Sequence, residues 1–589
     1  MKKNSSKPSL KNNVKTFFKV LKYLKRYKIL FIISQILTAL SVVLTLYIPI
    51  LVGEAIDLAI GKNQVDLKGI SEKLFIIACC IGATALFQWI INVINNRMVY
   101  GIVKNVRRQA FCKIQDLPIS YIDSHQSGDI INRLIADADQ FSDGLLMGFT
   151  QFFSGVMTIL GTLIFMMLIS PLVTLIVVFI TPLSLFVAAF IAKKTYSMFK
   201  LQSEVRGEQT SHIDEMITNH KTVVAFGYEK KSGDKFNEIN ERLSKTSLRA
   251  IFFSSITNPS TRFVNSLVYA FVALTGAMIC ISGGAIITVG MLSSFLSYST
   301  QYTKPFNEIS GVVTELQNAL ACAERVFDII DAPGQVPDKD GNAVDASATV
   351  EFKNVSFSYT DEKPLIENFN FFVEAGTHVA IVGPTGCGKT TLINLLMRFY
   401  DVKSGAILFC GTDIRDIPRS ILREKYGMVL QDTWLCEGTI RENIAYGNPD
   451  ASEEEIINAA KSAYAHSFIR KLPKGYDTVI GEKASLSQGQ KQLLCIARIM
   501  LCNPEILILD EATSSIDTRT EMKIQKAFKK LMNGRTAFVV AHRLSTIKES
   551  DVILVMRDGN IVEQGTHNEL LLKDGFYNML YNSQFPISD

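Results

Sequence analysis

A chain of 589 residues is too long for a single hydrophobic core, so two or more domains are expected. The residues are 48% hydrophobic and the net charge is only +5, but the apolar residues are concentrated in the first half. The basic residues beside them point to a membrane surface rather than to nucleic acid. The ten cysteines show neither CxxC pairing nor the spacing of metal ligands, so reduced thiols are expected.

Residues 1–28 are strongly basic, with ten Lys and Arg residues and no acidic residue. From Val14 to Lys28, aromatic and aliphatic residues alternate with lysines at nearly helical spacing. A helix with one apolar and one cationic face lies in the membrane interface, where anionic lipids attract it. We therefore expect an interfacial (elbow) helix here.

Six membrane spans are expected between residues 29 and 330. A helix needs about 20 apolar residues to cross the hydrocarbon core. Two charge-free stretches each supply one span, namely Ile29–Gly53 and Leu74–Asn96. Two longer ones each supply two spans, namely Gly144–Ala192, interrupted at Ser170 and Pro171, and Phe263–Thr303, interrupted at Ser282, Gly283 and Gly284.

The positions of Lys and Arg predict the orientation of these spans. Basic residues follow the second span from Arg97 onward and the fourth span from Lys193 onward, and the opposite loops are short. Because cytoplasmic loops are enriched in Lys and Arg, both termini are expected in the cytoplasm of a bacterium, with the protein multi-pass in its plasma (inner) membrane. Arg262 and Lys304 lie near the inner ends of spans five and six, where snorkelling would account for them.

Two long cytoplasmic loops, residues 97–143 and 193–249, have helical patterns that extend the spans into the cytoplasm. Each has a short interruption, at Pro118–Ser124 and at Thr222–Lys230, and both are candidate contacts with a domain below the membrane. Residues 331–348 are rich in Pro, Gly and Asp, which predicts a linker. A soluble domain at residues 349–589 follows.

A phosphate-binding motif follows a short apolar strand at His378–Val382. The GxxxxGK[ST] pattern predicts that backbone N–H groups and a helix N-terminus hold the phosphates of ATP. Lys389 would reach the terminal phosphates, and the Thr390 hydroxyl would bind Mg²⁺. The residues assigned to this loop are Gly383, Pro384, Thr385, Gly386, Cys387, Gly388, Lys389, Thr390 and Thr391.

A second apolar strand, Glu505–Asp510, ends in two adjacent carboxylates. Burying two carboxylates is energetically costly unless they bind a metal ion or form hydrogen bonds. Asp510 is placed to bind Mg²⁺, and Glu511 is the candidate general base for the attacking water. An ordinary helix-capping role for the pair remains the alternative.

Between these motifs, Leu486–Gln490 (LSQGQ) resembles the LSGGQ signature of the ABC transporter family. Four further residues match the family in the same order. The resemblance implies that Tyr359 stacks on adenine and that Gln431 links Mg²⁺ to the membrane domain. It also implies that Asp517 lies in the loop that crosses to a partner, and that His542 contacts the γ-phosphate during hydrolysis.

The resemblance covers nearly the whole chain and is to the exporter branch. It implies an α-helical six-span transmembrane bundle with long cytoplasmic helix extensions, joined to an α/β P-loop ATPase domain with a helical subdomain. In this family two ATPase domains face each other, so Ser487, Gly489 and Gln490 would contact the partner chain's ATP. The expected function is ATP-driven export of hydrophobic or amphipathic compounds of the multidrug type.

Gln488 stands where the family usually has glycine, whereas the chain's own phosphate loop and carboxylates are intact. This favours a heterodimer, in which the partner supplies a complete signature, over a homodimer. A homodimeric lipid flippase is the alternative within the family. An ATP-gated channel or regulatory ATPase is the alternative of another class.

Overall fold

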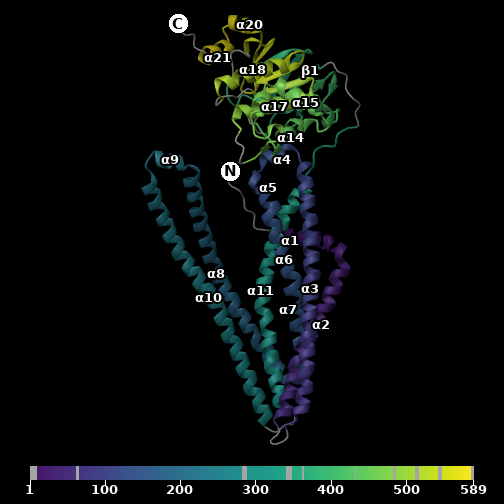
Figure 1. Ribbon diagram of the computed structural model, residues 1–589. Coiled ribbons are helices and arrows are strands. Elements are labelled where there is room, and N and C mark those ends of the chain that lie inside the picture. Colours follow the sequence, from purple (N-terminus) through teal and green to yellow (C-terminus); the bar gives the residue numbers. More distant parts are fainter. Residues whose placement is uncertain are drawn as a thin grey trace. The chain divides into compact units, whose positions relative to one another are not determined.

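The computed structural model divides the chain into two compact units, here called unit 1 (residues 1–115 and 126–332) and unit 2 (residues 116–125 and 333–589) (Figure 1). The structure describes residues 10–60, 65–281, 288–339, 348–360, 364–430, 433–481, 486–510, 516–540 and 547–584. Residues 116–125 belong to unit 2, although in the sequence they interrupt the helices of unit 1.

Unit 1 is helical. Its elements are α1 (Leu10–Leu24), η1 (Lys25–Tyr27), α2 (Lys28–Ala59), α3 (Leu67–Gln115), α5 (Ser127–Asn132), η2 (Arg133–Asp137), α6 (Ala138–Met147), η3 (Gly148–Phe152), α7 (Phe153–Ile169), α8 (Pro171–Thr218), α9 (His220–Ala225), α10 (Glu229–Ile281) and α11 (Val289–Asp331). The turns η2 and η3 are π-helical, so α5, α6 and α7 form one continuous helical stretch with two local widenings.

In the described part of the chain, four helical stretches are long and apolar enough to cross a membrane: Lys15–Ala59, Leu67–Gln115, Ser127–Ile169 and Arg262–Ile281. The predicted break between spans three and four is present, because Ser170 is extended and Pro171 begins α8. The predicted break at Ser282, Gly283 and Gly284 lies outside the described residues.

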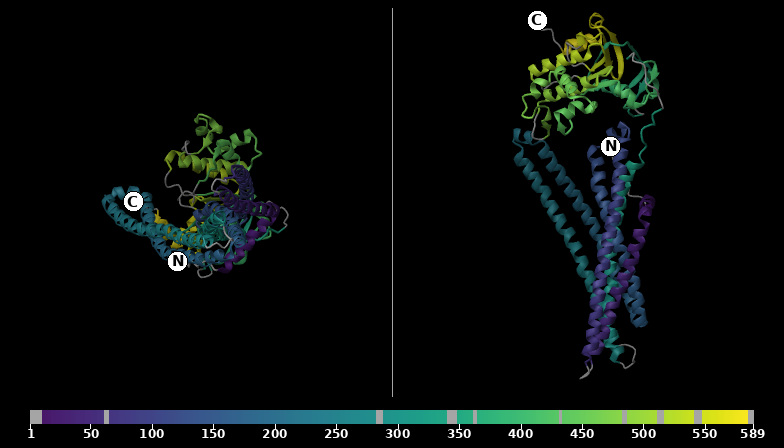
Figure 2. Two further views of the ribbon diagram at one scale, coloured as in Figure 1. Left: turned by 90° about the horizontal axis from the view of Figure 1, so that it is seen from below. Right: turned by 45° about the vertical axis from the view of Figure 1, so that its right-hand side comes forward.

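The helices α8 and α10 form a long hairpin whose tip is the short helix α9 (Figures 1 and 2). They lie side by side and continue from the apolar stretches into charged ones, as predicted for residues 193–249. At the tip, Phe226 is 81% exposed, and Val224 and Tyr228 are also exposed. The predicted interruption at Thr222–Lys230 therefore corresponds to the end of α9 and the turn into α10.

Small residues bring the helices of unit 1 close together. A Cβ added at Gly144 would lie 2.3 Å from the Ala319 side chain, and one at Gly148 would lie 2.8 Å from Leu316. Glycine at these positions lets the α6–α7 stretch approach α11 closely. In lipid no hydrophobic effect drives helices together, so close packing at small residues is the main source of their association. Nearby, Arg325 donates two hydrogen bonds, of 2.6 and 2.5 Å, to the buried carboxylate of Asp137.

Unit 2 contains α4 (Ile119–Ser124) and an α/β fold. Its strands are β1 (Val350–Phe357), β2 (Ile366–Val373), β3 (His378–Val382), β4 (Ser404–Phe409), β5 (Thr412–Asp413), β6 (Tyr426–Val429), β7 (Gly438–Thr439), β8 (Val479–Ile480), β9 (Ile506–Asp510), β10 (Thr536–Val540), β11 (Val552–Arg557) and β12 (Asn560–Gly565). Its other helices are α12 (Lys389–Leu396), α13 (Arg419–Glu424), α14 (Ile440–Ile444), η4 (Ala445–Gly447), α15 (Glu453–Ser462), α16 (His466–Ile469), η5 (Gly475–Asp477), α17 (Gln488–Cys502), α18 (Thr518–Met532), α20 (His567–Leu572) and α21 (Phe576–Gln584).

The largest sheet of unit 2 has the strand order β12-β11-β3-β10-β9-β6, and its pairs are parallel except for β11 with β12. The strands β3, β9 and β10 are almost fully buried, which explains their unbroken apolar sequences. The second sheet, β2-β1-β4-β5, is antiparallel and shares a hydrophobic core with the first.

The helices α14 to α17 form a helical subdomain of unit 2. Its residues Ile444, Ile469 and Leu494 belong to a second hydrophobic core, which is shared with one face of the large sheet and with α18. Together, the long helices of unit 1 and the α/β fold of unit 2, with its helical subdomain, agree with the predicted fold class.

Candidate functional site

The phosphate-binding loop connects β3 to α12, as the motif predicts. Gly386 and Gly388 have φ angles of +84° and +102°, which are unfavourable for any residue with a side chain. A Cβ at Gly383 would lie 2.3 Å from the carbonyl oxygen of Met556, so this glycine also allows a close backbone approach. The glycines therefore permit a loop whose backbone N–H groups curl around an anion at the start of α12.

Lys389 is only 8% exposed and its ammonium group is held by the loop itself. It donates hydrogen bonds to the carbonyl oxygens of Gly383, at 2.7 Å, and Pro384, at 3.0 Å. The side chain is thus folded over the loop, with its charge at the place where the terminal phosphates would lie. The Cys387 side chain is buried in the core beneath the loop, so only its backbone faces the site.

A pocket of about 500 Å³ lies above the loop, lined by Tyr359, Leu365, Thr385, Gly386, Gly388, Lys389, Thr390, Thr391, Asp510 and Val540. Asp510 reaches it because β9 and β3 both pair in parallel with β10, so all three strands end at one edge of the sheet. Ligands of open α/β sheets bind at this edge. The Thr390 hydroxyl and the Asp510 carboxylate are hard oxygen donors that could hold Mg²⁺ beside a triphosphate.

Tyr359 forms the opposite wall of this pocket. Its ring is 50% exposed, and its hydroxyl is fixed by contacts to Thr391, at 3.2 Å, and to the amide of Asn394, at 3.3 Å. Tyr400 packs edge-on against the ring at a centroid distance of 5.0 Å. The ring is held in place while half of its surface stays open, which is the arrangement required for stacking on a base.

Tyr400 also connects this wall to α4. Its hydroxyl donates a 2.5 Å hydrogen bond to the carboxylate of Asp123, in the predicted contact segment Pro118–Ser124. Burial, and then the bond to Asp123, raise the pKa of Tyr400 above its ordinary value, so the phenol remains a proton donor at neutral pH. A short series of contacts therefore runs from α4 through Tyr400 to Tyr359. The segment that contains Asp123 and the residue Tyr359 were both predicted, whereas Tyr400 was not.

The segment that follows α11 and leads into unit 2 is bonded to residues just before α4. The backbone N–H of Gln335 donates to the carbonyl of Asp116, and its side chain donates to the carbonyl of Leu117. Further along, Arg419 donates to Asp338 at 2.6 Å. The first part of the predicted linker, up to residue 339, is therefore bonded to the ATPase unit, and residues 340–347 lie outside the described structure.

The signature segment begins α17. Ser487 is its N-cap and forms a capping box with Gln490, in which each side chain bonds the other's backbone N–H. Gly489 is required for packing, because a Cβ there would lie 2.5 Å from Thr520 and 2.9 Å from Ile516. Gln488 is exposed in the first turn. The N-terminus of this fifteen-residue helix thus points a partial positive charge outward, where it could receive an anion.

Asp517, the predicted crossing residue, is exposed and is the N-cap of α18. Its carboxylate accepts a 2.9 Å hydrogen bond from the backbone N–H of Thr520, and this bond lowers the pKa of Asp517. Three predicted residues, namely Gln431, Glu511 and His542, lie outside the described residues. Their assignments stay predictions.

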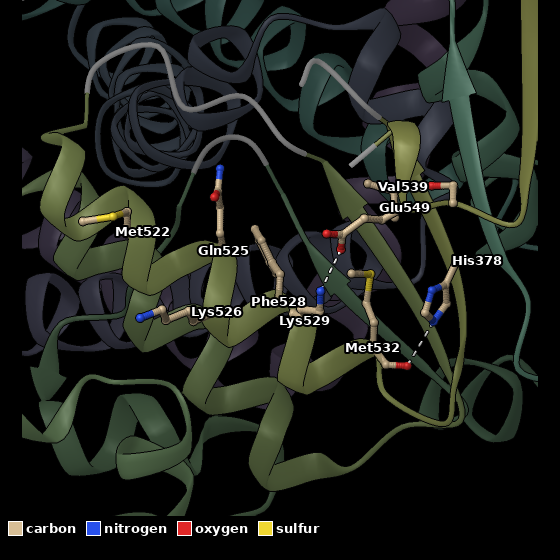
Figure 3. A pocket seen from close by; sticks show the side chains of 10 residues that line it. His378, Met522, Gln525, Lys526, Phe528, Lys529, Met532, Val539 and Glu549 are labelled. Carbon is tan, nitrogen blue, oxygen red and sulfur yellow. Dashed lines mark hydrogen bonds and ion pairs between the residues drawn. The ribbon is translucent and has the colours of Figure 1, made fainter. Parts of the chain in front are cut away.

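A larger pocket, of about 760 Å³, lies beside α18 and away from the phosphate loop (Figure 3). Of its two lysines, Lys526 and Lys529, the second is paired with Glu549 at 3.1 Å, and His378 contacts the carbonyl of Met532 at 3.3 Å. It contains neither a glycine loop nor an uncompensated cluster of charges. Size alone is therefore a poor guide here, and the chemistry of the lining identifies the smaller pocket as the functional site.

The fold and the site together define a membrane protein with a P-loop ATPase domain. The family profile described as the ABC transporter transmembrane region matches residues 31–306, and the one described as ABC transporter matches residues 366–514. The chain belongs to the ABC transporter family and is an ATP hydrolase of the exporter type.

Three known proteins illustrate the similarity. A fatty acid ABC transporter ATP-binding/permease protein of Mycobacterium tuberculosis is 40% identical over 88% of this chain and 83% of its own length. An ATP-dependent lipid A-core flippase of Syntrophus aciditrophicus is 36% identical over 97% of this chain and 94% of its own length. The structure of a bacterial Atm1-family ABC exporter with ATP bound has a TM-score of 0.77 at 27% identity, covering 96% of this chain and 99% of that one.

The open face of Tyr359 generates a prediction for ATP affinity. Stacking of an aromatic side chain on a base is worth about 1–3 kcal/mol, so Tyr359→Ala should raise the KM for ATP roughly tenfold and leave kcat within about twofold. Tyr359→Trp keeps a stacking surface and should restore the affinity. Steady-state ATPase assays on the purified protein measure both. An alanine variant with unchanged KM would mean that the base lies elsewhere.

The Asp123–Tyr400 bond generates a second prediction. Tyr400→Phe removes the hydroxyl and keeps the ring against Tyr359, so ATP binding should persist while its effect on the helices near α4 weakens. Hydrogen-exchange mass spectrometry with and without MgATP should show normal protection of the phosphate loop and a reduced change in α5 and α6.

Asp123→Ala should give the same result, and the double variant should be no worse, because one bond is removed in all three cases. Additive effects of the two substitutions would contradict the proposed link.

Proposed function

We propose that this chain is one half of an exporter that couples ATP hydrolysis at a dimeric interface to outward movement of hydrophobic or amphipathic compounds across a bacterial inner membrane. The observation that carries the proposal is that α4, which lies between α3 and α5 in the sequence, is bonded through Asp123 to Tyr400, and Tyr400 packs against Tyr359 in the wall of the ATP pocket. Both termini lie in the cytoplasm in this proposal, as the basic loops predict.

In the proposed reaction the glycine loop and Lys389 hold the phosphates, and Thr390, Gln431 and Asp510 hold Mg²⁺. Bound Mg²⁺ would neutralise charge that develops on the phosphates. Glu511 would orient and deprotonate the attacking water, and His542 would contact the γ-phosphate. The partner chain would complete each site with its signature helix, as Ser487 and Gly489 do for the partner's site.

The exposed tip of the α8–α10 hairpin supports a dimer. An apolar group such as Phe226, at 81% exposure beyond the membrane-spanning part, is unfavourable in water unless a partner covers it. The signature sequence bears on whether the partner is a second copy of this chain or a different chain. Gln488 places a long side chain in the first turn of α17, where the partner's γ-phosphate would approach, and this favours a heterodimer.

A polar pocket between α10 and α11 supports an amphipathic cargo. Its volume is about 570 Å³, and it lies at the Arg262 end of the apolar stretch Arg262–Ile281, the end that the basic residues predict to be cytoplasmic. It is lined by Arg262, Asn265, Ser266, Tyr269, Ser299, Thr300, Thr303 and Lys304. Arg262 has no ion-pair partner among the residues described, and the buried side-chain oxygen of Asn265 has no hydrogen-bond partner there.

A cluster of polar groups beside an apolar span is a candidate place for a polar ligand group. Thr300 and Thr303 bond to carbonyl oxygens of their own helix, and Lys304 pairs with Glu308. Arg262 and Asn265 are therefore the groups that a ligand would satisfy. A compound with an apolar body and an anionic head would place the head here and the body among the exposed apolar side chains.

The cargo proposal predicts the behaviour of Arg262→Ala/Lys304→Ala. With oleate as an anionic probe and oleyl alcohol as its neutral counterpart, stimulation of ATPase by oleate should fall several-fold in the variant, while stimulation by the alcohol and basal turnover stay unchanged. If stimulation by both probes fell equally, the variant would be generally impaired, and the assignment of the two cations to an anionic head group would be wrong. Stimulation of the wild type by phospholipid alone would favour the lipid flippase.

The subunit proposal predicts that the chain purified alone in nanodiscs hydrolyses MgATP slowly and that a co-expressed sister chain raises turnover. Mass photometry gives the oligomeric state, and Glu511→Gln supplies the control, with ATP binding retained and turnover lost. A stable homodimer with steady hydrolysis would refute the heterodimer. Ion conductance without stoichiometric hydrolysis would instead support the ATP-gated channel.

A further inference from the structure

A cationic pocket of about 480 Å³ lies in unit 1, where the N-terminal helix α1 meets α3 and the end of α11. Lys19 and Lys22 of α1 and Arg26 of η1 contribute its cations. Their spacing of three and four residues brings all three side chains to one face of the helix. The pocket is separate from the ATP site and from the polar pocket between α10 and α11.

The positive charge of this pocket is only partly compensated. Asp331, the last residue of α11, forms an ion pair with Lys19. In the part of the chain that the structure describes, Lys22 and Arg26 have no carboxylate partner, and Asp331 is the one acidic residue in the lining. Two uncompensated positive charges in a concave site attract an anion more strongly than isolated surface lysines do.

The frame of the pocket is rigid. The rings of Tyr23 and Phe327 stack at 5.9 Å with an interplanar angle of 13°, and the Lys19 ammonium lies 5.5 Å above the Phe327 ring. The Tyr23 hydroxyl donates a 2.5 Å hydrogen bond to the side-chain oxygen of Gln109. These contacts join all three helices and hold the walls of the pocket together, while Lys22 and Arg26 stay exposed at its rim.

The remaining lining offers hydrogen-bond donors. Because the Gln109 oxygen already accepts from Tyr23, the free capacity of this amide is its two N–H groups, and Asn105 adds a second amide. Arg26 has a planar fork of donors that matches two oxygens of a phosphate. The combination of ammonium, guanidinium and amide donors suits an oxyanion such as a phosphate and disfavours a cation.

We propose that this pocket binds the phosphate group of an anionic compound, with an anionic phospholipid of the inner leaflet as the source that the position of α1 favours. The helix is amphipathic and directly precedes the first span, and basic amphipathic helices of this kind attract anionic lipid. A bound phosphate would join α1 to the end of α11, the helix that leads into the ATPase unit.

The test compares two variants of equal charge. Lys22→Ala/Arg26→Ala removes the two uncompensated cations, whereas Lys15→Ala/Lys25→Ala removes two exposed lysines of the same segment that do not line the pocket. The full-length protein, with its partner chain if one is required, is reconstituted in phosphatidylcholine nanodiscs with or without phosphatidylglycerol. Native mass spectrometry after release into detergent then counts the retained phosphatidylglycerol.

One phosphatidylglycerol per chain should remain bound to the wild type and to Lys15→Ala/Lys25→Ala. Each lost cation is worth about 1 kcal/mol, so Lys22→Ala/Arg26→Ala should bind roughly thirtyfold more weakly. Equal retention by both variants, or equal loss from both, would overturn the pocket as a specific site.

A second arm identifies the source of the phosphate. In nanodiscs of phosphatidylcholine alone, inorganic phosphate should leave the thermal stability of the wild type unchanged, whereas phosphatidylglycerol should raise it. Stabilisation by inorganic phosphate that disappears in Lys22→Ala/Arg26→Ala would overturn the lipid source and assign the pocket to a soluble phosphate compound. Basal ATPase serves as the folding control, because neither pair of residues lies at the ATP site.

Discussion

The hydrocarbon core of the membrane is the constraint on which the rest of this structure depends. No water is available there to bond backbone N–H and C=O groups, so the chain must cross as helices that satisfy their own hydrogen bonds. Unit 1 is accordingly built from helices of up to 53 residues that continue past the apolar stretches. These long helices are interrupted at α4 and at α9, and α4 belongs to unit 2.

At α4 the physical connection can be followed residue by residue. Asp123 bonds to Tyr400, and Tyr400 packs against Tyr359, whose hydroxyl contacts the first turn of the helix that follows the phosphate loop. Each contact is short, and the Tyr400 phenol is kept protonated by burial and by its bond. These contacts connect α4 to the wall of the nucleotide pocket within unit 2.

The residues of the signature segment have structural roles that also serve the proposed contact with an anion. Ser487 and Gln490 are occupied in capping α17, and Gly489 exists to let that helix approach α18. These are structural roles, and they orient the helix so that its N-terminus is available to an anion. Structural and functional demands on the segment coincide, because a helix end must be rigid before its dipole can act at a fixed place.

Local patterns in the sequence determined much of this protein. The unbroken apolar strands β3 and β9, the glycines of the phosphate loop and the break at Ser170 depend on neighbours within a few residues, so their positions could be predicted. The widened turns η2 and η3 could not, because they arise from packing against other helices. The Asp123–Tyr400 bond joins residues 277 positions apart, and the cationic pocket needs three separate helices. Only the tertiary structure decided these features, since spacing along a chain specifies which side chains share a helix face but not which face of another helix they meet.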